Sequence, residues 1–159
     1  MNLLINYLLI FLVSMVPLVE LRGAIPIAVA MELDYFTSLV ICVLGNMLPV
    51  PLIYFFARKV LIWGADKKYI GKFFRFCLEK GEKGGQKLVS KAGRGGLFVA
   101  LMLFVGIPLP GTGAWTGTLA ASFLNMGIKS TAVSVSLGVI IAGLIMGIAS
   151  TGVFSIIGF

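Results

Sequence analysis

The sequence predicts an all-α integral membrane protein. It would be an inverted repeat of two re-entrant helical hairpins and two transmembrane helices, joined by a basic amphipathic helix. Of its 159 residues, 59% are hydrophobic and 12% are charged, with a mean hydropathy of +1.07. Several apolar runs are long enough to cross a hydrocarbon core of about 30 Å. We expect one membrane domain, with repeat 1 at 1–63, a cytoplasmic linker at 64–94 and repeat 2 at 95–159.

The N-terminal region predicts the first hairpin. Residues 3–19 are apolar and nearly long enough to cross, whereas the next apolar piece, 24–31, would cover only about 12 Å as a helix. Because this second arm cannot cross, we expect the chain to break at 17–23 and return to the side from which it entered. Glu20, Arg22 and Gly23 would then lie at the hairpin tip.

The following segment predicts a transmembrane span and then a surface helix. Residues 36–63 are apolar apart from Asn46 and a basic pair near their end, and Pro49-Val50-Pro51 should kink the helix. Residues 58–94 carry eleven of the thirteen basic residues and three of the six acids, which favours the cytoplasmic side. They include a helical pattern of apolar and basic residues, expected to lie on an anionic inner leaflet. The predicted membrane-surface residues are Lys67, Lys68, Lys72 and Arg75.

The second half repeats this order of elements. Apolar residues resume at 96–107, stop at the P-L-P-G-T-G turn and resume in a short arm at 114–125. Residues 130–159 are uncharged and long enough for one tilted span. A shift of about 90 residues sets Gly23-Ala24 on Gly113-Ala114, so we interpret the halves as an internal repeat.

The distribution of basic residues predicts the topology. If 58–94 is cytoplasmic, the first hairpin enters from outside and the second from inside, as in the inverted repeats of many transporters. The acidic corner of Glu32 and Asp34 would face outside and Lys129 inside. We therefore expect a multi-pass protein of the cell (inner or plasma) membrane with both termini extracytoplasmic.

Glu20 and Arg22 form the most informative motif. They lie in P-L-V-E-L-R-G-A-I-P, and residues 2–19 carry no charge. Charged side chains at membrane depth are costly and are usually paired and functional. Arg22 offers a planar fork of donors for phosphate or carboxylate, and Glu20 could exchange a proton if desolvation favours its neutral form. The alternative is that the arm ends at Val19 and the pair lies in interfacial water.

The turn of the second hairpin completes the predicted site. Its prolines stop a helix, its glycines permit close approach, and a helix starting near Thr112 would aim its N-terminal N–H groups at the tip, where they could bind an anion. The alternatives are a plain loop outside the membrane and, for Trp115, an interface anchor. The predicted substrate- or ion-binding residues are Glu20, Arg22, Gly23, Pro26, Pro108, Pro110, Gly111, Thr112, Gly113, Trp115 and Thr116.

Composition argues against several other kinds of site. The chain has no His, the commonest metal ligand and the usual acid–base group near neutral pH. Cys42 and Cys77 have no second Cys at ligand spacing, and we interpret both as structural. The basic segment mixes aromatic and basic residues, but it adjoins membrane spans, so we expect no nucleic-acid partner. We likewise expect no metal, no cofactor and no enzymatic activity.

The chain resembles a known family over essentially its whole length, and two motifs are the basis of this resemblance. E-L-R-G-A-I-P in the first half and P-L-P-G-T-G-A-W-T-G in the second resemble the small multidrug export proteins. That family is distantly similar to the DedA, or VTT, membrane proteins, which share paired re-entrant hairpins and for which polyprenyl-phosphate transport or lipid scrambling has been proposed. DedA-like proteins carry arginines around the second proline–glycine turn, where this chain has Thr112 and Trp115.

These observations predict a small proton-coupled secondary transporter, or a flippase, for an anionic lipid or lipid phosphate such as a polyprenyl phosphate. Its partners would be membrane lipids, this substrate and further copies of the chain in a homodimer or larger homo-oligomer, because two spans and two hairpins scarcely enclose a path. The competing hypothesis is a non-transporting scaffold that recruits partners or anionic lipid through its basic helix.

Overall fold

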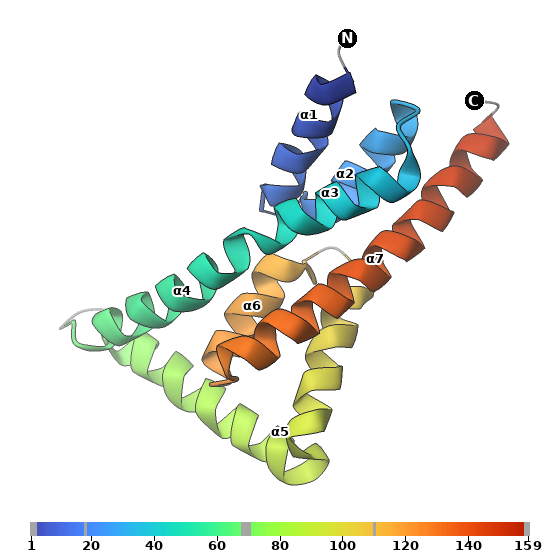
Figure 1. Ribbon diagram of the computed structural model, residues 1–159. Helices are drawn as coiled ribbons and strands as arrows, with labels where there is room; N and C mark the ends of the chain where they lie inside the picture. The colour runs from blue at the N-terminus through green and yellow to red at the C-terminus, as the bar shows by residue number, and fades with distance from the viewer. Residues whose placement is uncertain (1–2, 18, 68–70, 110, 158–159) are drawn as a thin grey trace.

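The computed structural model describes residues 3–17, 19–67, 71–109 and 111–157, and within these ranges it is helical without strands. The predicted all-α class is therefore confirmed for the described part of the chain. The helices, shown in Figure 1, are α1 (Leu3–Met15), α2 (Glu20–Ala30), α3 (Tyr35–Met47), α4 (Pro49–Ala65), α5 (Gly71–Gly106), α6 (Ala114–Phe123) and α7 (Ile128–Ile157).

Helices α1 and α2 form the first hairpin, and their 13 and 11 residues are too few to cross a bilayer. The sequence predicted a break that extends through Gly23, but α2 already begins at Glu20. That part of the prediction is wrong because the Gly23 N–H bonds the Val19 carbonyl at 3.0 Å and closes a helical turn. A Cβ on Gly23 would overlap the Val19 side chain, so glycine lets this turn form beside the break. Pro26 lies inside α2 and is partly exposed.

Among the described residues, two stretches are long and apolar enough to cross a membrane, as predicted. Helices α3 and α4 together run over Tyr35–Ala65, and α7 provides Ile128–Val153. Leu48, between α3 and α4, keeps helical torsion angles, and α4 begins at Pro49, where the sequence predicted a kink. At the start of the first span, the Asp34 carboxylate accepts hydrogen bonds from the Thr37 backbone N–H at 2.8 Å and from its hydroxyl at 2.6 Å, so Asp34 is an N-cap.

Helix α5 contains both the basic helix and the first arm of the second hairpin. Gly93 interrupts it with a φ of +70°, a conformation that glycine adopts without a steric penalty. The helix bends sharply within its length, as Figure 1 shows. The predicted basic helix is thus present, but it begins at Gly71. Lys67 precedes it, with its Nζ 4.4 Å from the centre of the Trp63 ring, and Lys68 lies outside the described residues.

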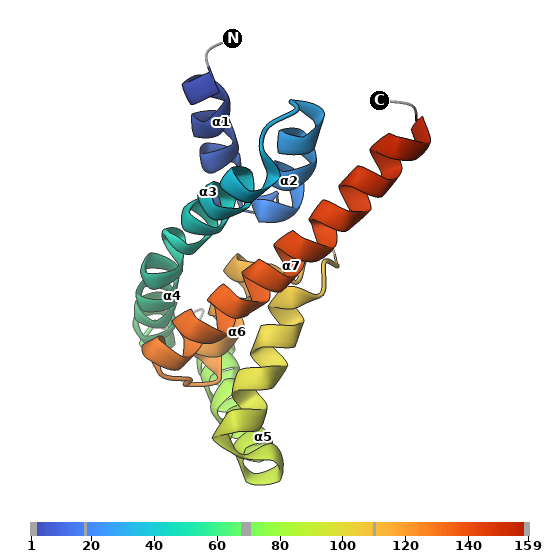
Figure 2. The same ribbon diagram turned by 45° about the vertical axis from the view of Figure 1, so that its right-hand side comes forward.

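Each short arm packs on the long helix of the other half. Helix α2 contacts α7, and α6 contacts α4, while α1 packs on α3 and the second part of α5 on α7. Figures 1 and 2 show the two hairpins opening toward opposite ends of the molecule with their tips near its middle. Fully buried side chains from both halves form one core, including Ile10, Leu21, Ile25, Val105, Val135 and Val139.

The two halves share a backbone pattern at an offset of 93 residues. Glu32 and Asn125 both have a φ of +55°. The residue after each, Leu33 or Met126, donates its N–H at 3.0 Å to a carbonyl five residues earlier. Helices α3 and α7 start at matching positions, 35 and 128. The glycine–alanine pairs suggested an offset of about 90, three residues smaller than this offset of 93. The segment between α5 and α6 (107–113) is three residues longer than the segment between α1 and α2 (16–19), so the offset is not constant along the halves.

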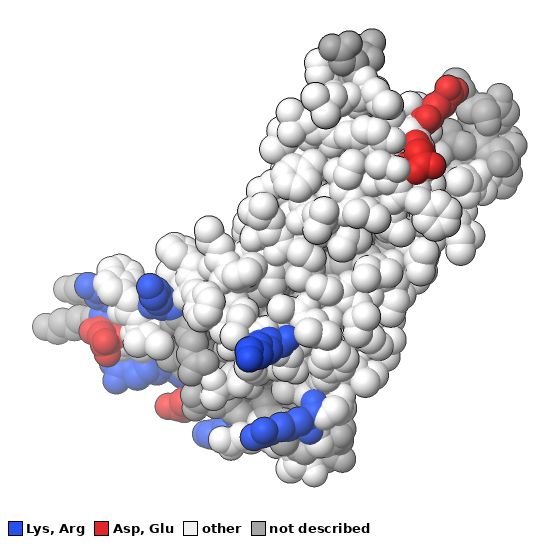
Figure 3. Space-filling view, viewed as in Figure 1, with Lys and Arg blue, Asp and Glu red and all other residues white. Residues whose placement is uncertain are grey.

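Basic side chains are concentrated at one end of the molecule. In Figure 3, Lys and Arg gather, with some acidic side chains among them, at the end formed by α4 and the basic part of α5, whereas the opposite end shows acidic side chains and no Lys or Arg on this face. Glu32 and Asp34, in the corner between α2 and α3, are both exposed. The two hairpins therefore open toward opposite ends of the molecule, and one of these ends is rich in Lys and Arg.

Candidate functional site

The Arg22 guanidinium lies on the carbonyl end of α5. Its Nη2 donates to the carbonyls of Val105 at 3.1 Å, Ile107 at 3.2 Å and Thr112 at 2.7 Å, and to the Thr112 hydroxyl at 2.9 Å. Its Nη1 donates to the Leu109 carbonyl. The last carbonyls of a helix lack intrahelical partners and carry partial negative charge, so a cation there satisfies them. Arg22 therefore binds the turn of the second hairpin.

The Glu20 carboxylate occupies the N-terminus of α6. Its Oε2 accepts the Ala114 N–H and its Oε1 the Trp115 N–H, each at 3.0 Å, and the side chain is only 4% exposed. Because a helix N-terminus carries partial positive charge, it attracts an anion. The sequence predicted that this end could hold a substrate anion, and in this structure the carboxylate of the other hairpin takes those donors.

Glu20 reaches α6 from a strained backbone. Its φ is +52°, in the left-handed region, which costs a non-glycine residue about 1–3 kcal/mol and is concentrated at functional sites. The Glu20 N–H nevertheless bonds the Val16 carbonyl at 3.0 Å, which fixes the turn between α1 and α2. The hairpin break thus aims the carboxylate across the molecule.

Two residues of the second hairpin complete the contact. A Cβ on Gly113 would overlap the Glu20 carboxylate, so only glycine leaves room for it. The Trp115 indole Nε1 donates to the Met15 carbonyl at the end of α1, at 3.2 Å. We call the contacts of Glu20, Arg22 and Trp115 across the hairpin tips the tip clasp. All the hydrogen bonds described for the side chains of Glu20 and Arg22 belong to it.

A pocket of about 190 Å³ adjoins the tip clasp. The structure brings six of the predicted site residues to its wall: Glu20, Arg22, Gly111, Gly113, Trp115 and Thr116. Thr112 lies in the clasp itself. Gly23, Pro26 and Pro108 do not line the pocket, and Pro110 lies outside the described residues.

Sequence reasoning missed three residues of this region. Pro17 and Leu119 also line the pocket; Leu119 could have been found because it lies one helical turn after Thr116. Asn46 is 2% exposed, has no hydrogen-bond partner for its Oδ1, and borders a narrow gap together with Glu20 and Arg22. Its signal was a polar residue within an apolar span, which the sequence analysis noted without assigning it to the site.

Other predicted groups lie apart from the clasp. Lys72 and Arg75 are exposed on the first turns of α5. Cys42 is buried in α3, with its Sγ 3.9 Å from the Ile10 carbonyl. Within the described ranges, no group of three or more His, Cys, Asp or Glu residues could hold a metal ion.

Comparison with known proteins identifies the family. The profile of the family described as "Putative small multi-drug export protein" matches residues 20–145, from Glu20 at the clasp to the middle of α7. The chain belongs to the small multidrug export protein family. The family's description names a role in export, which agrees with the two membrane-length stretches among the described residues. No curated protein and no solved structure matches the chain.

Proposed function

We propose that this small multidrug export protein is a proton-coupled membrane transporter or flippase whose substrate carries an anionic group, such as a lipid phosphate. The observation that supports this most strongly is the position of the Glu20 carboxylate, which holds both N–H donors of Ala114 and Trp115 at the start of α6. A substrate anion would need these same donors. Glu20 therefore acts as an internal anion that the substrate must displace.

Protonation of Glu20 provides the coupling. With Glu20 ionised, its charge cancels that of Arg22, and the α6 N-terminus is occupied. When Glu20 takes a proton, its oxygens become weaker acceptors for Ala114 and Trp115, and the site gains a net positive charge from Arg22 and the helix end. Phosphate then binds at the pocket where the ionised carboxylate excluded it. Loss of the proton reverses the exchange.

Arg22 links substrate binding to movement of the hairpins. Its guanidinium holds the turn of the second hairpin by donating hydrogen bonds to backbone carbonyls between Val105 and Thr112. A phosphate is a stronger partner for its planar fork than backbone carbonyls are. If Arg22 turns from these carbonyls to the substrate, the two hairpin tips lose part of their connection and can separate. The clasped structure is then the state without substrate.

We further propose that the fold is an inverted repeat in the membrane, with both hairpins re-entrant, residues 58–94 cytoplasmic and both termini outside. The 93-residue backbone offset, the exchange of short arms between the halves and the concentration of basic residues at one end in Figure 3 support this arrangement. We expect the working unit to be a homodimer or a larger homo-oligomer, because one copy offers two membrane-length stretches among its described residues.

The test is calorimetric binding of farnesyl monophosphate to purified protein in two buffers with different ionisation enthalpies. The wild type should take up close to one proton per bound ligand beyond the uptake by the ligand's own phosphate. Glu20→Gln should bind without this additional proton, and Arg22→Met should bind at least about tenfold more weakly, since a hydrogen-bonded charge contributes about 1.5–3 kcal/mol.

Glu32→Gln is the matched control, because Glu32 is an exposed acid outside the clasp; it should retain the wild-type proton uptake. Equal proton uptake by the wild type and Glu20→Gln would contradict the coupling role of Glu20. If Arg22→Met binds farnesyl monophosphate with the same affinity as the wild type, Arg22 does not bind the anion.

A scaffold function is the competing proposal, and the exposed Lys72, Arg75 and Phe76 on one end of α5 favour it. A scaffold should lose activity when the basic residues of 67–75 become Gln and should tolerate Glu20→Gln. A transporter should show the opposite sensitivity while both variants insert normally.

A further inference from the structure

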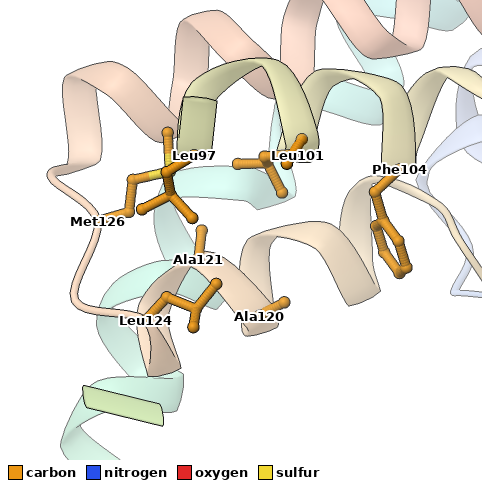
Figure 4. A pocket seen from close by; sticks show the side chains of 8 residues that line it. Leu97, Leu101, Phe104, Ala120, Ala121, Leu124 and Met126 are labelled. Atoms are coloured by element: carbon orange, nitrogen blue, oxygen red, sulfur yellow. The ribbon is translucent and has the colours of Figure 1, made fainter. Parts of the chain in front are cut away.

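An apolar groove lies between the second part of α5 and α6, and none of its lining residues lines the pocket at the tip clasp. It has a volume of about 180 Å³. Figure 4 shows side chains from both helices facing it. Its lining is entirely hydrophobic: Leu97, Ala100, Leu101, Phe104, Ala120, Ala121, Leu124 and Met126. Three of these are alanines, and their small side chains leave the width of the groove open.

A larger hollow with a partly polar lining lies beside one end of the groove. This second hollow has a volume of about 400 Å³ and shares Leu97, Leu124 and Met126 with the apolar groove. Its other lining residues are Arg94, Asn125, Gly127 and Ser130. The apolar groove thus adjoins a hollow whose lining includes one positively charged side chain, Arg94, and we call this hollow the mouth of the groove.

The position of Arg94 follows from the break in α5. Gly93, with its φ of +70°, separates the basic helix from the apolar arm, so Arg94 begins that arm. Between Leu97 and Phe104 the arm rises about 10 Å. A molecule that follows it would therefore place an apolar chain of roughly this length inside the groove and its polar end beside Arg94.

We propose that this groove binds the part of one acyl chain nearest the headgroup of an anionic phospholipid, with the lipid phosphate at Arg94. Charge decides the occupant: the mouth lies toward the end of the molecule where Lys and Arg gather in Figure 3, and such clusters attract anionic headgroups. A hydrophobic peptide would fill the groove but would leave the charge of Arg94 unused. The site is separate from the tip clasp and does not depend on the proposed transport function.

Native mass spectrometry of the full-length protein tests the site. The detergent-purified protein is titrated with phosphatidylglycerol or with phosphatidylcholine of the same acyl chains. We expect the wild type to retain one phosphatidylglycerol more strongly than phosphatidylcholine. Arg94→Gln should weaken phosphatidylglycerol retention about fivefold, the factor for about 1 kcal/mol per basic residue. Ala100→Leu with Ala120→Leu should fill the groove and weaken retention of both lipids.

The controls change similar side chains outside the groove. Lys129→Gln removes an exposed positive charge, and Val99→Leu enlarges an exposed residue of α5 that does not line the groove; both should bind like the wild type. Equal retention of the two lipids by the wild type would overturn the headgroup assignment. Unchanged lipid retention in the variant with Ala100→Leu and Ala120→Leu would show that the groove is not the lipid site. Lipid-free protein dimers that are present in the wild type and absent in this variant would show that a second copy of the protein occupies the groove, which would also overturn the proposal.

A second measurement does not depend on the folding of any variant. Phosphatidylglycerol with a photoreactive acyl chain is crosslinked to the wild type, and the adducts are mapped by peptide sequencing. We expect adducts on residues 97–104 and 120–126. Adducts confined to other helices would overturn the proposal.

Discussion

The space beyond the Gly113 Cα is filled by the Glu20 carboxylate, a side chain 93 residues earlier in the sequence. A Cβ at position 113 would overlap both carboxylate oxygens, which accept the N–H groups of Ala114 and Trp115. The glycine of one hairpin and the acid of the other are therefore complementary in size and in charge.

This complementarity predicts that Gly113→Ala breaks the clasp. Displacing Glu20 leaves the buried Ala114 N–H and the partly buried Trp115 N–H without their acceptor, a loss of about 1–3 kcal/mol for a buried donor. Thermal unfolding in mild detergent should show the decrease. Gly95→Ala is the matched control, because a Cβ there meets nothing within 4 Å. The effect of Gly113→Ala should shrink in a Glu20→Ala background, since the two residues are in contact; strictly additive losses would show that they are not coupled.

Arg22→Lys should also destabilise the protein, despite retaining the charge. A lysine ammonium lacks the planar fork with which Arg22 reaches the carbonyls of Val105, Ile107, Leu109 and Thr112. We expect a loss of roughly 2 kcal/mol, equivalent to one or two hydrogen bonds to a charged group. Lys129→Arg is the control for a change between the two cations at an exposed position. Unfolding curves that coincide for Arg22→Lys and the wild type would contradict the importance of the fork.

The Asp34 N-cap at the start of the first span should make the stability of the protein depend on pH. Hydrogen bonds from the Thr37 side chain and backbone lower the pKa of the Asp34 carboxyl below its ordinary value of 3.8. A lowered pKa means that the N-cap contributes stability above about pH 4 and that this contribution is lost as the pH falls through the folded-state value. Asp34→Asn should remove this part of the acid sensitivity, as unfolding measured between pH 7 and pH 3 would show. Equal acid sensitivity in the variant and the wild type would contradict it.

The proposed topology predicts which cysteines are accessible from each side. In a Cys-free background, single cysteines near Glu32 should react with an impermeant thiol reagent from outside. Cysteines near Lys83 and Lys129 should react only from the cytoplasmic side. The reason is the concentration of Lys and Arg at one end of the molecule, which favours retention of that end on the cytoplasmic side. Reaction near Lys129 from outside would disprove the inverted arrangement of the hairpins.

The positions of the helices could largely be predicted from the sequence. Length and hydropathy indicated the two spans, and the proline–glycine turn indicated the second hairpin, because these depend on local composition. The first break was misplaced since Pro17 and Gly23 both disrupt helices in general, and the Gly23 turn closes here on the Val19 carbonyl. The offset between the halves was placed at about 90 because it rested on small-residue identities, whereas the left-handed positions Glu32 and Asn125 lie 93 residues apart.

The site could be predicted only as a set of residues. Glu20 and Arg22 were found because charge within an apolar run is rare, and the glycines because they form a dense turn. The sequence could not show that the acid binds the helix end and the arginine the preceding carbonyls, since these contacts join residues almost a hundred positions apart. Asn46 was not assigned because a lone amide has no motif.

The exchange of short arms has a consequence for biosynthesis. Helix α2 packs on α7. Helix α7 leaves the ribosome about 100 residues later than α2, an interval of roughly 5 to 20 s at the usual rate of synthesis. During this time, Glu20 and Arg22 have been made while the hairpin that receives their hydrogen bonds is still incomplete. The nascent chain must therefore keep two charges hydrated at the membrane surface, or shielded by another protein, until its second half arrives.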